Sequence, residues 1–242
     1  MKLHKFSKLA EFLSVAIIIS SLLTVRCLLL DNQPEEKTVE DKSKKEDSLI
    51  ANMDSATVFE RCNLYYSSEN YTEAFKCFQK AAEQEDALAQ LYLGFMYQYG
   101  QGVKQDYFKA VEWYQKAAEQ GYADAQFFLS NMYYAGKGVK QDYFKSFEWN
   151  QKAAEQGTAD SQFNLGFMYE DGRGVKQDYF KAFEWYQKAA DQGHANAQYN
   201  LGLMYYNGQG VRQNYTKAKE YFGLACDNKD QAGCDMYRKL NQ

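Results

Sequence analysis

The stretch GVKQDYFK occurs three times in this chain, at Gly102–Lys109, Gly138–Lys145 and Gly174–Lys181. The last two copies belong to longer segments, 123–158 and 159–194, which are identical at 25 of 36 positions. Further copies of the same 36-residue unit occupy residues 87–122 and 195–230. A fixed period of this length predicts an array of supersecondary units, each stacked on its neighbours. Such arrays usually present long binding surfaces, so we expect an interaction protein.

Each unit predicts two antiparallel helices. In the unit 87–122, residues at helical spacing run from Ala87 to Tyr99, and Gly100 follows as a C-terminal stop. A second helical run, Tyr107–Gln120, comes directly after Asp106, a residue type that favours the N-cap position. The other units carry Asp or Asn at that place: Asn70, Asp142, Asp178 and Asn214. Caps are our interpretation, with a glycosylation sequon as the alternative at Asn70 and Asn214.

Small and aromatic residues repeat where the two helices of a unit must meet. The first helix carries a small residue that allows close approach: Gly94, Ser130, Gly166 and Gly202. The second helix carries another: Ala110, Ser146, Ala182 and Ala218. Aromatic residues recur with the same period, as at Tyr97, Tyr133, Tyr169 and Tyr205 and at Trp113, Trp149, Trp185 and Tyr221. We assign this ladder to the packed core rather than to a cofactor site.

The repeats resemble a known family. Leu93-Gly94-x-x-Tyr97 followed by Ala110-x-x-x-Tyr114 resembles the tetratricopeptide signature. The GxGV-x-x-D-Y-x-K-A segment is similar to that of the Sel-one-like repeat (SLR) family over residues 87–230. Residues 51–86 look like a degenerate first repeat with a shorter loop, and we expect a C-terminal capping helix within 231–242. The resemblance implies an all-α fold, a right-handed α-solenoid of helix pairs that mediates protein–protein contacts.

The N-terminus has the pattern of a targeting segment. Lys2, Lys5 and Lys8 precede the apolar stretch Phe12–Val25, so residues 1–30 are typical of a secretory signal. No A-x-A cleavage site follows, and residues 12–30 just suffice to span a bilayer as an anchor. Both readings stay open, and both predict export to the periplasm, cell envelope or medium. Residues 31–50 are charged and lack aromatic residues, which predicts a disordered linker.

Composition argues against several function classes. A net charge of −4 with scattered basic residues disfavours nucleic acid as a partner. The only histidines, His4 and His194, leave no catalytic triad or histidine metal cluster, and we predict no enzyme, metal or cofactor. The cysteine-rich branch of the SLR family implies one alternative, a weak penicillin-binding or β-lactamase-like protein, although no Ser-x-x-Lys motif occurs. A secreted host-interaction factor is the other alternative.

Four cysteines lie outside the targeting segment, an even number that suggests disulfides in an exported chain. The spacing of Cys226 and Cys234 across a helix turn resembles the cysteine-rich branch, whose helices are stapled at this place. Cys62 stands at the close-approach glycine position and Cys77 at the tryptophan position, so these two could also meet. A buried thiol is the alternative for each pair.

The resemblance also implies where a partner would bind. In tetratricopeptide-like solenoids the first helix of each pair lines a concave groove. Residues just after the close-approach position, and one turn before it, point into that groove and vary between units here. They are Leu91, Phe95, Tyr99, Phe127, Asn131, Tyr134, Phe163, Phe167, Glu170, Tyr199, Leu203 and Tyr206. We predict that a protein or peptide segment binds there, with aromatic anchors and with Asn131 available to a peptide backbone.

Overall fold

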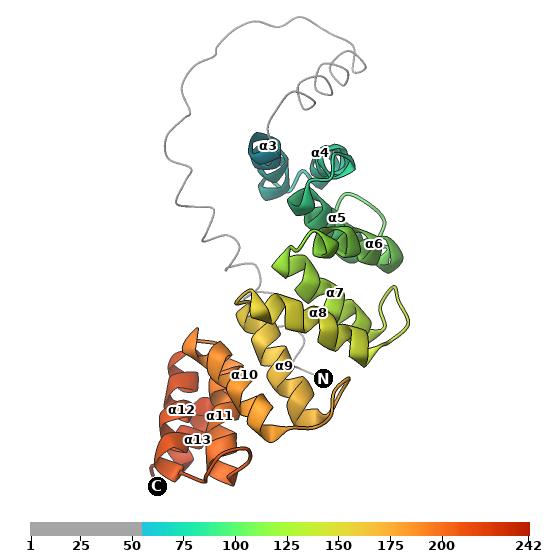
Figure 1. The fold of residues 1–242 in the computed structure, drawn as a ribbon. Coiled ribbons are helices and arrows are strands. Elements are labelled where there is room, and N and C mark those ends of the chain that lie inside the picture. The colour runs from blue at the N-terminus through green and yellow to red at the C-terminus, as the bar shows by residue number, and fades with distance from the viewer. Residues whose placement is uncertain (1–54) are drawn as a thin grey trace, which may run out of the picture. The chain divides into compact units, whose positions relative to one another are not determined.

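A computed structural model describes residues 55–242, and this part of the chain contains helices without strands. The helices form consecutive pairs, and each helix packs against the next one along the chain (Figure 1). The predicted α-solenoid is therefore confirmed. The predicted signal or anchor segment 1–30 and the linker 31–50 lie outside the described residues. Within 55–242, no helix has the length and apolarity to cross a membrane.

The helix boundaries repeat with the sequence. The first helices of the pairs are α3 (Ser55–Ser67), α5 (Ala87–Tyr99), α7 (Ala123–Ala135), α9 (Ala159–Asp171) and α11 (Ala195–Asn207). The second helices are α4 (Tyr71–Glu83), α6 (Tyr107–Glu119), α8 (Tyr143–Glu155), α10 (Tyr179–Asp191) and α12 (Tyr215–Asp227). A last helix, α13 (Gln231–Lys239), packs against α12. The sequence predicted α5 at the same bounds and α6 within one residue.

Local signals explain these boundaries. Gly100 ends α5 in the left-handed conformation, with φ of 70°, which a glycine adopts without a side-chain clash. Asp106 caps α6, because its carboxylate accepts hydrogen bonds from the backbone N–H groups of Phe108 (3.0 Å) and Lys109 (3.2 Å). Asn214 caps α12 in the same way. Asn70 precedes α4 without a side-chain capping bond, so the cap predicted there is wrong.

The close-approach positions carry the packing that the sequence predicted for them. A Cβ added to Gly166 would lie 2.5 Å from the ring of Tyr186, and one added to Gly202 would lie 2.6 Å from the ring of Phe222. Gly94 has the same relation to Tyr114. In these units the aromatic ring of the second helix therefore lies directly on the backbone of the first helix. Each of these three rings is fully buried.

Buried glutamines join one unit to the next. Gln126 on α7 donates to the carbonyl of Ala118 on α6 (3.1 Å) and accepts from the side chain of Gln156 (2.9 Å). Gln156 also donates to the carbonyl of Gly121 (3.0 Å). Gln90, Gln162 and Gln198 make the corresponding bonds to the unit before them. These repeated bonds satisfy buried polar groups and fix the offset between neighbouring units.

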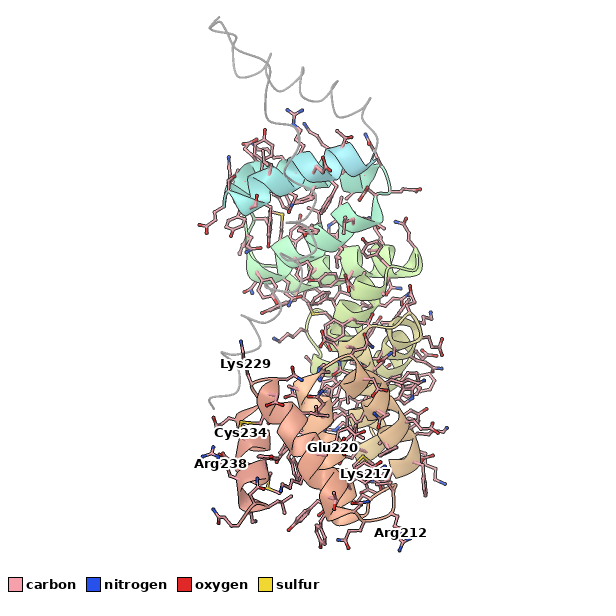
Figure 2. All side chains as sticks on the ribbon, turned by 90° about the vertical axis from the view of Figure 1, so that its left-hand side faces the viewer. Arg212, Lys217, Glu220, Lys229, Cys234 and Arg238 are labelled. Carbon is pink, nitrogen blue, oxygen red and sulfur yellow. A yellow bond between two sulfur atoms is a disulfide. The ribbon has the colours of Figure 1, made fainter. Side chains whose placement is uncertain are left out.

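Both cysteine pairs form disulfides. Cys62 on α3 is bonded to Cys77 on α4, with Cα atoms 5.3 Å apart, and both side chains are buried. Cys226 on α12 is bonded to Cys234 on α13, with Cα atoms 4.5 Å apart. Figure 2 shows Cys234 on the last helix, close to the turn marked by Lys229. The first disulfide joins the two helices of the first pair, and the second joins α12 to the last helix α13, so each ties down one end of the described array.

Candidate functional site

The first helices α7 and α9 present one polar and aromatic face. On α7, Asp124, Phe127, Asn131 and Tyr134 follow one another at spacings of three, four and three residues. This spacing places all four side chains on the same side of the helix. The corresponding face of α9 runs from Asp160 through Phe163 and Phe167 to Glu170.

A hollow of about 330 Å³ opens between these faces. Its volume is at the lower end of the range for small-ligand sites in proteins. We call it the asparagine pocket and define it by its lining residues: Asn131, Tyr134, Asn150, Phe163, Asn164, Phe167 and Met168. Four of these seven are groove residues predicted from the sequence. The structure thus brings Asn131, Tyr134, Phe163 and Phe167 together around one cavity.

The pocket exists because three aromatic rings are replaced by amides. One unit earlier, the ring of Tyr114 packs against Phe128 with centroids 5.6 Å apart and against Phe95 at 5.8 Å. The positions 36 residues later hold Asn150, Asn164 and Asn131. Asparagine is shorter than tyrosine or phenylalanine and cannot fill the same space. The side chains therefore leave a cavity although the helices retain their arrangement.

The three amides are only loosely bonded to one another. The Asn164 Nδ2 lies 3.4 Å from Asn131 Oδ1 and 3.5 Å from Asn150 Oδ1. The Asn150 Nδ2 faces the sulfur of Met168 at 3.8 Å, and a thioether is a weak acceptor. Asn150 is only 2% exposed, so its amide is buried with little compensation. The inner end of the pocket can consequently both donate and accept hydrogen bonds.

The side chain of Ser130 is accommodated because no aromatic ring stands at position 150. Ser130 stands where the other full units have glycine, and its hydroxyl donates to the carbonyl of Phe127 (2.8 Å). A side chain at the equivalent Gly94 or Gly166 would collide with a tyrosine ring. Ser130 fits because Asn150 stands in place of that tyrosine. The two changes form a compensating pair.

Arg173 lies at one end of the pocket. It donates to the hydroxyl of Tyr134 and forms an ion pair with Asp171. Its guanidinium carbon lies 5.7 Å from the ring centroids of both Tyr134 and Phe167 and 5.6 Å from that of Tyr143, within the range of cation–π contacts. Phe167 is 36% exposed beside it. This end of the groove is therefore aromatic and carries a cation.

The opposite end of the same face is acidic. His194 stacks on Phe163, with centroids 4.6 Å apart, and its Nε2 lies 3.2 Å from a carboxylate oxygen of Asp160. Burial and, secondarily, the charge of Asp160 raise the pKa of Asp124. Two neighbouring carboxylates disfavour each other's ionised form, and a cationic group of a ligand would relieve this repulsion.

The remaining predicted groove residues lie in other surroundings. Phe95 contacts Phe128 edge to face (4.4 Å) and stacks on the partly exposed Tyr99, while Phe127 packs on Phe128. Glu170 accepts a hydrogen bond from the hydroxyl of Tyr186 (2.6 Å). Burial first, and then this carboxylate, raise the pKa of Tyr186. Towards the C-terminus, Tyr199 packs on Phe222, Tyr206 packs on Tyr215, and Leu203 is half-buried in the same cluster.

Leu91 is a correction to the predicted groove. Its side chain is 3% exposed and packs with Ala110 and Val111 in a hydrophobic cluster. The helical spacing was right, but α5 and α6 are covered there by α7. A ligand in the groove cannot reach Leu91.

Three lining residues were missed at the sequence level: Asn150, Asn164 and Met168. A signal for the first was present, because position 150 breaks the aromatic series of Tyr114, Tyr186 and Phe222. Asn164 gives no such signal, since Asn200 occupies the same place one unit later. Met168 repeats as Met96, Met132 and Met204 and is indistinguishable from a core residue in the sequence. Within residues 55–242, no group of three His, Cys, Asp or Glu side chains is placed to hold a metal ion.

Comparison with known proteins identifies the repeats. The Sel1 repeat profile matches residues 64–86, 87–122, 123–158, 159–194 and 195–230. The last four ranges coincide with the repeat boundaries predicted from the period, whereas the first match begins at residue 64, inside α3, and not at residue 51. No curated protein matches the chain in a sequence search.

Solved structures with the same fold include two Sel1-like proteins. A protective antigen of uropathogenic Escherichia coli that displays an SLR fold is 36% identical, with a TM-score of 0.71. The alignment covers 74% of this chain and 39% of the antigen, so the chain spans well under half of that relative. A Sel1 repeat protein from Oxalobacter formigenes is 37% identical with the same TM-score, and 74% of each chain is covered. Proteins built from Sel1 repeats generally mediate protein–protein contacts and are generally not enzymes. The present chain belongs to the Sel1 repeat family.

Proposed function

We propose that this protein is an exported interaction scaffold that holds an extended segment of a partner protein along the faces of α7 and α9. The observation that carries the proposal is the asparagine pocket. It lies on the first-helix face, where residues vary between units although packing positions repeat. A partner with its own sequence requires such variation, whereas packing does not.

The charges of the face support a defined orientation of the segment. Asp124 and Asp160 lie in the first turns of α7 and α9, and Arg173 follows the end of α9. A helix of 13 residues is about 20 Å long, which corresponds to roughly six residues of extended chain. A segment with a basic residue at one end and an acidic residue at the other would complement this pattern. Charge complementarity of this kind sets orientation and association rate more than affinity.

Export is part of the proposal. Residues 1–30 read as a signal peptide or anchor, and both disulfides in 55–242 are of the kind that persists in oxidising compartments. Cell fractionation tests this, combined with thiol alkylation before and after reduction. We expect the protein in the envelope or medium with its four repeat cysteines protected until reduction. Reactive thiols at those positions in protein from growing cells would contradict export.

The binding proposal is tested by display of random peptides on the full chain. We expect parent protein to enrich peptides that a triple variant, Phe127→Ala, Tyr134→Ala and Phe167→Ala, captures poorly while its helicity is unchanged. The matched control is Phe180→Ala on α10, which removes a 72% exposed ring outside the groove and should bind like the parent. Equal capture by the folded triple variant would place the binding site elsewhere.

A further inference from the structure

The asparagine pocket has the shape of a missing side chain. At the same position of the second helix, the chain has Phe78, Tyr114, Tyr186 and Phe222, all fully buried. Only the unit 123–158 has asparagine there. The pocket walls include Asn131 and Asn164, which correspond to Phe95 and Phe128 around the Tyr114 ring. A ring at position 150 would therefore project into the space that is now empty.

The tyrosines of neighbouring units show how a ring is held at this place. The hydroxyl of Tyr114 donates to Gln98 Oε1 (2.8 Å), and the hydroxyl of Tyr186 donates to Glu170 Oε2 (2.6 Å). Each tyrosine thus combines a buried ring with one polar contact at the groove side. The residue that corresponds to Gln98 and Glu170 in the pocket is Tyr134, and Asn131 lies one turn before it.

Resting on the proposed function, we infer that the asparagine pocket receives a tyrosine side chain of the partner segment. The ring enters from the groove and occupies the space that Tyr114 and Tyr186 fill in their own units. Phe163 and Phe167 supply aromatic contacts, and the sulfur of Met168 supplies a further one. The phenolic hydroxyl offers the buried amide of Asn150 a stronger hydrogen-bond partner than the Met168 sulfur, which lies 3.8 Å from its Nδ2.

The amides explain why tyrosine is preferred to other apolar residues. A phenylalanine would fill the space but leave the amides with only their long contacts of 3.4–3.8 Å. Sites built to bond a hydroxyl discriminate against the analogue that lacks it. A leucine would neither fill the cavity nor pair with the amides. The chain itself offers no such group from its N-terminal part, because residues 1–54 contain no tyrosine. The proposed occupant is a tyrosine of the partner segment.

The pocket can be filled by introducing the residues that stand at the equivalent positions of other units. The double variant Ser130→Gly, Asn150→Tyr reproduces the glycine and tyrosine pairs at positions 94 and 114 and at 166 and 186. We expect it to fold and to fill the pocket with its own ring. Asn164→Phe is a second variant, which reproduces Phe128 and narrows the pocket at a half-buried site. Phe180→Ala again serves as the control outside the groove.

The probes are N-acetyl-tyrosinamide and its phenylalanine and leucine analogues, titrated into the full chain and followed by NMR. We expect the tyrosine probe to bind about 5-fold tighter than the phenylalanine probe, as one net hydrogen bond allows. The leucine probe should bind at least about 10-fold more weakly than the tyrosine probe. Binding of the tyrosine probe should be lost in the double variant, weakened in Asn164→Phe and unchanged in Phe180→Ala. Equal binding of all three probes, or undiminished binding by the folded double variant, would overturn the inference.

Peptide display separates this inference from the proposed function. If enriched peptides require the groove residues but contain no common tyrosine and still bind the double variant, the tyrosine pocket is wrong and the scaffold function stands. If no peptide depends on the groove, the scaffold function in this form is wrong, whatever the small probes do. Enrichment of tyrosine peptides that bind the parent and not the double variant supports both.

Discussion

Two equivalent places in this array have similar sequences, but one is filled by aromatic rings and the other is a cavity. Around Tyr114, the rings of Phe95, Tyr114 and Phe128 form a closed layer, with centroids 4.4–5.8 Å apart. One unit later, three asparagines take these places around a hollow of about 330 Å³. Hydrophobic clusters continue on either side of the pocket. We refer to the two places as the ring layer and the asparagine pocket.

The difference teaches that the repeat geometry does not depend on what fills this layer. Gln120 donates to Gln90 at 2.9 Å beside the ring layer, and Gln156 donates to Gln126 at 2.9 Å beside the pocket. The capping aspartates and the left-handed glycines also recur in both places. Because these contacts hold the helices, one unit can exchange its rings for polar groups without losing its place in the array. Such an exchange creates a site at some cost in packing.

The largest expected effect comes from opening the ring layer. Tyr114→Asn removes a fully buried ring and places an amide among aromatic neighbours. We expect a loss of about 3–5 kcal/mol in the free energy of unfolding, as for other large-to-small changes in a core. Urea denaturation followed by circular dichroism measures it, with the 71% exposed Phe108→Ala as a control that should change little. A loss below about 1 kcal/mol would show that the ring layer adds no stability over the pocket.

The close-approach position should respond in opposite ways at the two places. In Gly166→Val the new Cβ would lie 2.5 Å from the ring of Tyr186, and overpacking of this kind costs about 1–3 kcal/mol. Ser130→Ala, at the same position beside the pocket, keeps a Cβ that is already accommodated and loses only one hydroxyl bond. Its free energy of unfolding should change by less than about 1 kcal/mol. Similar costs for the two variants would refute the assigned register.

Closing the pocket should stabilise the array when both partners are exchanged. Asn150→Tyr alone should destabilise, because its ring meets Ser130, whereas the double variant Ser130→Gly, Asn150→Tyr should exceed the parent in stability. A coupling energy of about 1–3 kcal/mol is expected for residues in direct contact. Thermal unfolding of the four proteins of the cycle measures it, at about 2–4 °C per kcal/mol for a chain of this size. Additive effects would mean that the two positions are independent.

The smallest effect concerns two serines near the pocket. The hydroxyls of Ser146 and Ser161 are buried and have no hydrogen-bond partner among the described residues, and the other full units have alanine at both positions. Ser146→Ala and Ser161→Ala should each stabilise by about 1 kcal/mol, since the cost of an unpaired hydroxyl disappears. The mirror change, Ala110→Ser in the ring layer unit, should destabilise by a similar amount. If Ala110→Ser also stabilised the protein, this explanation would be ruled out.

Most of the fold could be predicted from the sequence, because each unit repeats the same local signals for helix ends and close contacts. Gly100 marks the end of α5 and Asp106 the start of α6, and equivalent residues do the same in the other full units. The glycine at position 166 predicted a close contact that the ring of Tyr186 makes. The failures are local: Asn70 resembles its counterparts but makes no capping bond, and Leu91 has groove spacing but is covered by a neighbouring helix.

The sequence by itself determined the repeats, the helix pairs and the family, because these depend on short-range signals and on a period that needs no coordinates. The family resemblance also predicted a groove along the first helices, at positions that vary between units. Only the tertiary structure brought Asn131, Asn150 and Asn164 together, from three different helices and separated by up to 33 residues. A cavity forms where the side chains of several helices do not fill the space between them. No single segment of the sequence contains that information.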